Sequence, residues 1–131
     1  MNSKPTAAVP DVKAAAMDFL RKAAAGEVSE AFARYVSPTF RHHNPFFRGD
    51  AKSLRDAMQE NAQKNPNKIL EIQRALQDGD LVAIHSRVRQ IPQDRGAAVV
   101  HLFRFHENRI EELWDIGQAE PEKTVNEHGM F

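Results

Sequence analysis

Residues 101–118 read HLFRFHENRIEELWDIGQ, and this stretch decides the fold. Two runs rich in aromatic and branched residues flank the polar dipeptide Glu107-Asn108, which is typical of a turn. In the first run the alternate residues from His101 to Phe105 share one face, because successive side chains of a strand point to opposite faces. The stretch therefore predicts two antiparallel strands joined by a short turn.

Two further strands precede this hairpin, and three helices precede the four strands. The strand-like runs cover residues 69–77, 81–91, 97–105 and 110–118, and helical spacing covers about residues 11–25, 28–36 and 50–64, with Pro10 and Asp11 as the first helix start. Short connections between strands predict an antiparallel meander, and helices followed by such a sheet predict an α+β fold. We expect a single domain over residues 1–131, with residues 1–9 flexible, in which N-terminal helices pack on a curved antiparallel sheet.

The composition limits the partners and the compartment. The chain carries 18 basic and 18 acidic residues, so no net field attracts a nucleic acid or an anionic membrane. Cysteine is absent, which excludes disulfides and thiolate chemistry. The sequence contains no signal-like segment and no apolar run of membrane-spanning length. We therefore expect a soluble cytoplasmic protein with no nucleic-acid or membrane partner.

Three stretches in this order resemble the SnoaL-like family of predicted aldol-condensing proteins, within the nuclear-transport-factor-two-like superfamily. They are residues 40–45 (FRHHNP), 78–85 (DGDLVAIH) and 101–118, and the closing residues 126–131 (NEHGMF) are also similar. The resemblance implies a cystatin-like cone enclosing a pocket for a small apolar organic ligand. Proteins of this fold include polyketide cyclases, isomerases and non-enzymes, so the resemblance implies a pocket rather than one reaction.

The register of the hairpin decides which residue faces His101. A two-residue turn would place Trp114 opposite His101, and a three-residue turn would place Asp115 there. The resemblance to ketosteroid isomerase favours Asp115, because the matching strand there faces its ligand from the positions of Leu113, Asp115 and Gly117.

An imidazole beside a carboxylate can transfer protons, so His101 and Asp115 are the predicted catalytic pair. In this hypothesis the carboxylate orients the ring and raises its pKa, while burial returns that pKa toward neutrality. The alternative is structural: His101 is then a satisfied core histidine, and Asp115 caps a buried donor.

Six further residues are predicted to contact the substrate: His43, Asn44, His85, Phe103, Leu113 and Gln118. Asn44 falls where ketosteroid isomerase has its carboxylate base, which argues against isomerisation by the same groups; its alternative role is to cap the turn at Pro45. Gln118 stands where the SnoaL cyclases have an aspartate. A metal triad would need His85 on the face of the catalytic pair, and its own face is the less apolar one, so neither a metal nor another cofactor is predicted.

These observations predict a cofactor-free enzyme of the isomerase, lyase or cyclase type that acts on an apolar carbonyl-containing metabolite. The alternatives are a non-catalytic ligand-binding protein and an accessory protein that works through its outer sheet face. Trp114 and Glu112 fall on that outer face if Asp115 faces inward. An exposed tryptophan there is typical of a subunit contact, so we expect a homodimer through this face.

Overall fold

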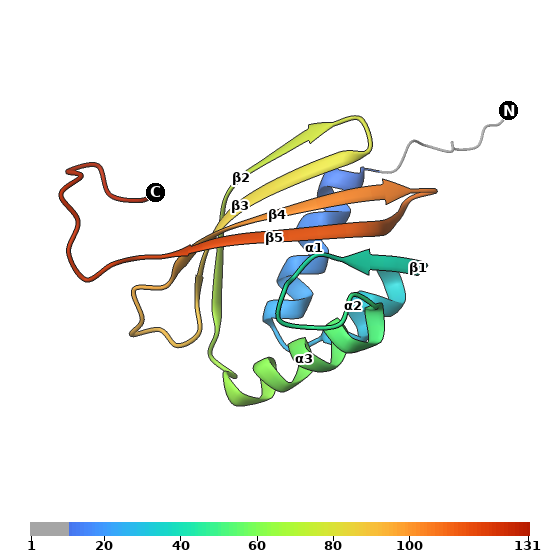
Figure 1. Cartoon of the computed structure of the whole chain (residues 1–131), viewed down its shortest axis with the longest axis horizontal. Helices are drawn as coiled ribbons and strands as arrows, with labels where there is room; N and C mark the ends of the chain where they lie inside the picture. The colour runs from blue at the N-terminus through green and yellow to red at the C-terminus, as the bar shows by residue number, and fades with distance from the viewer. Residues whose placement is uncertain (1–10) are drawn as a thin grey trace, which may run out of the picture.

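The computed structural model describes residues 11–131, so Pro10 and the flexible segment expected over residues 1–9 lie outside the described residues. Helices come first and most strands follow (Figure 1), which confirms the predicted α+β class. In chain order the elements are α1 (Val12–Ala24), α2 (Val28–Tyr35), β1 (Val36–His42), α3 (Ala51–Lys64), β2 (Ile69–Asp78), β3 (Leu81–Arg89), β4 (Ala97–His106) and β5 (Arg109–Ala119).

Aspartate side chains fix the starts of α1 and α3. Asp11 accepts a hydrogen bond from the backbone N–H of Ala14 at 3.0 Å, and Asp50 accepts one from the N–H of Ser53 at 2.9 Å. Such caps satisfy N–H groups that have no partner inside a helix. The two caps therefore define where α1 and α3 begin.

The five strands form one sheet in the order β1-β5-β4-β3-β2. Strands β2 to β5 pair antiparallel with their chain neighbours, as the meander prediction requires. β1 was not predicted; it pairs parallel with β5 and makes the sheet mixed rather than wholly antiparallel. Pro38 lies within this strand, which is acceptable because β1 is at the edge of the sheet.

The hairpin of β4 and β5 combines a two-residue turn with a bulge. Glu107 and Asn108 form the turn with φ of 49° and 68°, the left-handed values that a tight hairpin turn requires. His106 pairs with Arg109 and Phe105 with Ile110, but Arg104 pairs with Glu112. Glu111 is therefore an extra residue in β5, and the pairing beyond it is shifted by one residue. The shift places Asp115 opposite His101, the partner that the resemblance favoured, although the turn has the length expected to select Trp114.

The core lies between the inner face of the sheet and the helices. Phe19 of α1 and Phe103 of β4 are both fully buried, with ring centroids 5.9 Å apart in an edge-to-face arrangement. Phe32 of α2 packs on Phe19 at 5.4 Å. α1 packs against β2 and β3, whereas α3 packs against α1, α2 and β1, so α3 covers the region beyond β1 and not the centre of the sheet.

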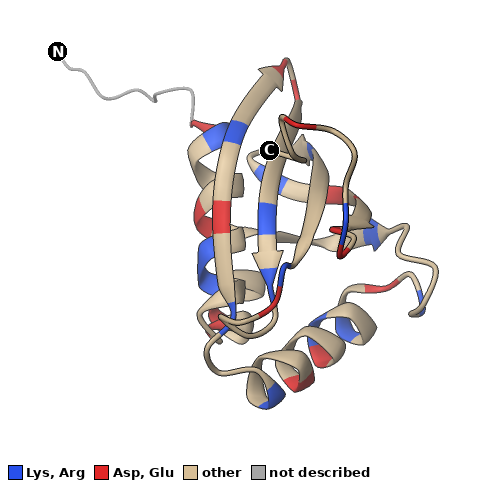
Figure 2. Cartoon of the chain, turned by 90° about the vertical axis from the view of Figure 1, so that its left-hand side faces the viewer, with Lys and Arg blue, Asp and Glu red and all other residues tan. Residues whose placement is uncertain are grey.

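Charged residues of both signs are interspersed over the helices and strands (Figure 2), in keeping with the balanced composition. In residues 11–131, no helix has the length and apolar character needed to cross a membrane.

Candidate functional site

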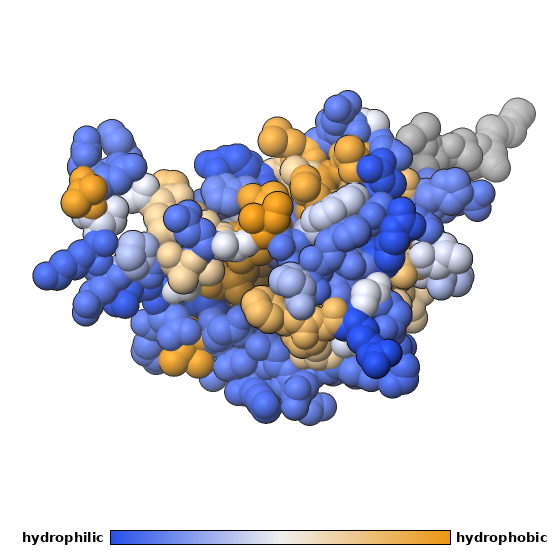
Figure 3. All heavy atoms as spheres, viewed as in Figure 1, coloured by the Kyte–Doolittle hydropathy of each residue, from blue (hydrophilic) through white to orange (hydrophobic). Residues whose placement is uncertain are grey.

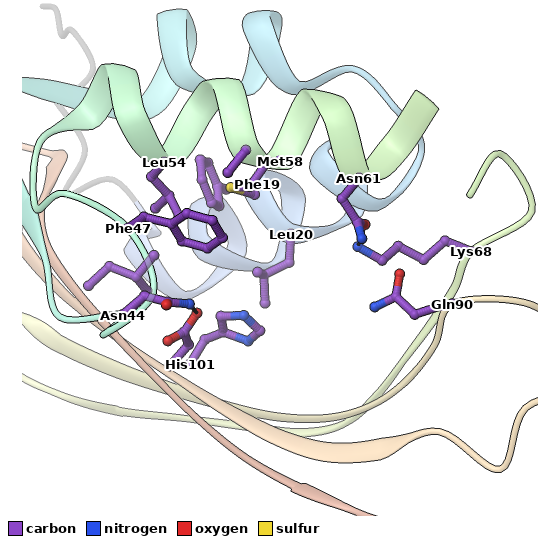
Figure 4. A pocket seen from close by; sticks show the side chains of 13 residues that line it. Phe19, Leu20, Asn44, Phe47, Leu54, Met58, Asn61, Lys68, Gln90 and His101 are labelled. Carbon is purple, nitrogen blue, oxygen red and sulfur yellow. Dashed lines mark hydrogen bonds between the residues drawn. The ribbon is translucent and has the colours of Figure 1, made fainter. Parts of the chain in front are cut away.

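A cavity of about 340 Å³ lies between α1, α3 and the inner face of the sheet. Its volume falls in the range of small-molecule sites. An adjoining hollow of about 220 Å³ shares several of its walls. The cavity is lined by Phe19, Leu20, Asn44, Phe47, Leu54, Ala57, Met58, Asn61, Lys68, Gln90, His101, Leu113 and Asp115 (Figure 4). Seven of these side chains are apolar and six are polar or charged, so the cavity offers both apolar surface and hydrogen-bonding groups.

His101 lies on β4 at the wall of this cavity. Its ring lies beside the Phe103 ring, with centroids 6.1 Å apart, and its Nδ1 is buried with no hydrogen-bond partner among the described residues. Burial lowers the pKa of His101 from 6.5 to about 4; the Asp115 carboxylate opposes this effect and the Lys68 ammonium adds to it. His101 is therefore neutral near pH 7, because desolvation outweighs the carboxylate that was expected to raise its pKa.

Asp115 lies beside His101 on β5, but the structure shows no hydrogen bond between the two side chains. Its Oδ2 instead accepts a hydrogen bond from Nδ2 of Asn44 at 3.0 Å. Oδ1 of Asn44 accepts one from the backbone N–H of Phe46 at 2.9 Å. Asn44 thus caps the turn after β1, as its alternative role required, and it also lines the cavity, where its contact with a substrate stays a prediction.

Lys68, Asn61 and Gln90 line the cavity and were not predicted. Nζ of Lys68 donates a hydrogen bond to Oδ1 of Asn61 at 2.6 Å, and burial lowers the pKa of Lys68. Asn61 had a signal in the sequence, because it follows Leu54 by seven positions and so lies on the same face of α3. Lys68 lies in the link between α3 and β2, where no periodicity applies.

Of the predicted substrate contacts, Leu113 lines the cavity and Phe103 does not. Leu113 is on the inward face of β5 with 4% of its surface exposed. Phe103 shares the inward parity of His101, yet α1 covers it completely, with Phe19 against its ring. Its ring packs against the His101 ring from within the core.

His43 does not reach the cavity, which corrects its prediction. The backbone N–H of His43 bonds to the carbonyl of Leu113, and its ring stacks on Trp114 with centroids 4.9 Å apart, on the outer side of the sheet. The adjacent His42 points inward and is buried, but it donates from Nε2 to the carbonyl oxygen of Arg48. Both histidines thus have structural partners.

His85 and Gln118 also lie on the outer face, contrary to their predicted roles. The buried side chain of Ile84 faces the core, so the side chain of the next residue, His85, points to the outer face of the sheet. Nδ1 of His85 bonds to the Arg74 guanidinium, and its ring stacks on Phe131. Gln118 is exposed on the same side of β5 as Trp114. His85 therefore does not converge with the catalytic pair, as a metal triad would require.

Glu112 and Trp114 occupy the outer face, but both already have partners. The Glu112 carboxylate is buried and accepts from Arg41 at 3.0 Å and from His43 at 2.6 Å, with Arg104 at 3.6 Å. Trp114 lies between the His43 ring and the Arg104 guanidinium. On the face seen in Figure 3, where β4 and β5 lie in front of α1, apolar side chains form separate groups among hydrophilic ones.

In this fold, helices cover a curved sheet and leave a cavity between them. This arrangement is typical of the nuclear-transport-factor-two-like, or cystatin-like, class of proteins. The model of the SnoaL-like domain matches residues 15–113, and the chain belongs to this family. No curated protein matches the sequence at a significant level.

Solved structures share the fold at low identity. A proposed isomerase of the SnoaL-like family from Agrobacterium tumefaciens is 13% identical, with a TM-score of 0.68 over 84% of this chain and 100% of that one. A proposed polyketide cyclase from Acidithiobacillus ferrooxidans is 18% identical, with a TM-score of 0.64 over 86% and 92%. An uncharacterised cystatin-fold protein from Novosphingobium aromaticivorans is 19% identical, with a TM-score of 0.67 over 82% and 99%. These identities establish the fold alone.

Proposed function

We propose that this protein is a cofactor-independent enzyme of the isomerase, lyase or cyclase type that acts on a small, mostly apolar, carbonyl-containing metabolite. One observation carries the proposal: Asp115 and a neutral His101 lie side by side on neighbouring strands, in a cavity that apolar side chains of α1 and α3 also line. Perturbed ionisable groups in a concave apolar site are typical of catalytic centres. The cyclase and isomerase descriptions of two structural neighbours belong to the same range of chemistry.

In the proposed reaction the ring N–H of neutral His101 donates a hydrogen bond to the carbonyl oxygen of the ligand. The Asp115 carboxylate then takes a proton from the carbon next to the carbonyl, and the electron pair of that C–H bond forms the enolate. In an isomerisation the protonated Asp115 returns the proton to another carbon of the conjugated enolate. In a cyclisation the enolate carbon attacks a second carbonyl carbon, whose π electrons move to its oxygen, and that oxygen takes the proton from Asp115. A neutral imidazole suits the first step because it polarises the carbonyl without losing its own proton to Asp115.

Asn44 supports this role of Asp115. Its Nδ2–H···Oδ2 hydrogen bond holds one carboxylate oxygen, which leaves the other oxygen for the ligand. The cap that Asn44 makes on the N–H of Phe46 fixes its amide in turn. Asn44 is thus a positioning residue, not a base.

A non-catalytic binding protein is the second candidate. The observation that favours it is that Asp115 is hydrogen-bonded to the Asn44 amide and not to His101, as expected for a carboxylate with a structural role. In that case the polar groups of the cavity only orient a ligand. The two candidates differ in whether a bound ketone exchanges its α-hydrogens.

The test follows deuterium exchange into 4-phenyl-2-butanone in D₂O by proton NMR, with the Met58 methyl signal reporting occupancy of the cavity. We expect exchange above the buffer rate, and a loss of about 10²–10⁴-fold of the protein-dependent rate in Asp115→Asn. The exposed Asp94 gives the matched control, Asp94→Asn, which should keep the native rate. If the ketone shifts the Met58 signal without any exchange above buffer, the binding-protein candidate replaces the enzyme.

A further inference from the structure

The cavity has two polar ends. Figure 4 shows Asn44 and His101 at one end and Lys68, Asn61 and Gln90 at the other, with apolar side chains such as Leu20 between them. The proposed chemistry uses only the end that carries His101. The end that carries Lys68 therefore has no assigned role.

Lys68 differs from other lysines of the chain in its surroundings. Lys22, Lys52 and Lys64 each lie within 3.5 Å of a carboxylate oxygen on the protein surface. Within residues 11–131 the ammonium groups of Lys13, Lys68 and Lys123 form no ion pair; of these, only that of Lys68 lines the cavity, where it bonds to the neutral Asn61 amide. Burial without a counter-ion lowers its pKa, and a partly desolvated cation of this kind attracts an anion from the cavity.

We propose that Lys68, with Asn61 and Gln90, forms an anion-binding subsite, and that the ligand of the cavity is a mostly apolar carboxylate. This inference rests on the proposed function only in taking the cavity as the ligand site, and it holds for the enzyme and for the binding protein alike. The substrate class becomes an apolar carboxylic acid that also carries a carbonyl group.

The donors present fit a carboxylate. An ammonium group has three N–H donors, of which Asn61 occupies one, so two remain for ligand oxygens. The Gln90 amide lies beside Lys68 in Figure 4 and can donate to the same group. A phosphate carries more charge and is usually held by several backbone N–H groups or arginines, whereas one lysine and apolar walls match a single negative charge.

The subsite also fixes the direction in which the ligand enters. A carboxylate bound at Lys68 keeps its charge away from the Asp115 carboxylate, so the opposite end of the ligand faces His101 and Asp115. A bound carboxylate would offset the positive charge of Lys68, whose repulsion of a protonated imidazole lowers the pKa of His101. Binding of the anion is therefore expected to raise the pKa of both Lys68 and His101.

The experiment compares 4-phenylbutyrate with its neutral isostere 4-phenylbutanamide. Both are titrated into the native chain and into Lys68→Met, with the Met58 methyl signal reporting occupancy and the Lys68 side-chain carbon signals reporting its ionisation. Lys64→Met is the control, because Lys64 is exposed on α3 and pairs with Glu60. We expect the native chain to bind the carboxylate about tenfold more tightly than the amide, since a hydrogen bond between charged groups is stronger than a neutral one.

Lys68→Met should abolish this preference by weakening the carboxylate alone, and Lys64→Met should retain it. In the native chain the carboxylate, but not the amide, should raise the pKa of Lys68, a readout that does not depend on the folding of any variant. Equal affinities for the two compounds, or a preference that survives Lys68→Met, would overturn the subsite and leave the proposed function intact. If neither compound shifts the Met58 signal, the subsite proposal fails, and the exchange test with 4-phenyl-2-butanone still decides the proposed function separately.

Discussion

Acidification should destabilise this fold through His101 in particular. The folded pKa of about 4 lies below the ordinary value of 6.5, so between these values the unfolded chain binds a proton that the folded chain does not. The free energy of unfolding must then fall as the pH falls from 6.5 toward 4. Above pH 6.5 His101 is neutral in both states, so it causes no such loss. At pH 4.5 the loss attributable to His101 is at most roughly 2.5 kcal/mol, from about 1.4 kcal/mol for each tenfold change in proton affinity.

The assay is urea unfolding at pH 7 and pH 4.5 for the native chain, His101→Gln and His106→Gln. The exposed His106 provides the matched control, and other titrating groups cancel in the comparison because all three chains share them. We expect His101→Gln to lose up to roughly 2.5 kcal/mol less than the native chain between the two pH values, and His106→Gln to behave like the native chain. The reasoning is refuted if His101→Gln shows the native pH dependence, or if the His101 ring titrates above pH 6 by NMR.

Three other changes test separate parts of the structure. Gly96→Ala should destabilise the fold by about 2 kcal/mol or more in urea unfolding, because a Cβ there, at φ of +89°, would lie 2.5 Å from a backbone oxygen. The control Gly26→Ala, at φ of +90° in open space, should cost about 1 kcal/mol. Equal costs would contradict the close approach at Gly96. Asn44→Ala should cost about 1–2 kcal/mol in the same assay, because it removes the hydrogen bond to Asp115 and the turn cap; a neutral effect would show that the turn holds without them. The predicted homodimer through the outer face should appear by light scattering and weaken in Trp114→Ala, and a monomeric native chain at all concentrations would end that prediction.

Local patterns predicted the helices and the meander, including the edge strand β2, but not the edge strand β1. Residues 69–118 alternate in sequence and pair with their neighbours, so both the strands and the turns leave a local signal. β1 is short, contains Pro38 and pairs with a strand some 70 residues later, for which the chain carries no local signature. The direction of His43 depends on that pairing, which explains why its placement could not be derived from the residues around it.

The candidate site was predictable where it lies on strands of known parity. His101, Asp115 and Leu113 follow from alternation once the register is known. Lys68 lies in a connection whose path depends on how α3 docks, so only the fold shows that it faces the cavity. The pKa of His101 could not be predicted from the sequence either. The register indicates a carboxylate beside the ring, but only the packing of the fold shows how strongly the ring is desolvated.

The bulge at Glu111 had a signal that strand alternation alone misses. Ile110 and Leu113 are both buried on the inner face although they are three residues apart, which an unbroken strand cannot achieve. Deletion of Glu111 would leave one residue between them and restore regular alternation while His101 still faces Asp115. We therefore expect the deletion variant to fold, to lose no more than about 2 kcal/mol in urea unfolding, and to keep the His101 pKa near 4 by NMR. A variant that folds with the His101 pKa near 6.5 would show that the ring has left its buried site, and that the bulge does more than correct the register.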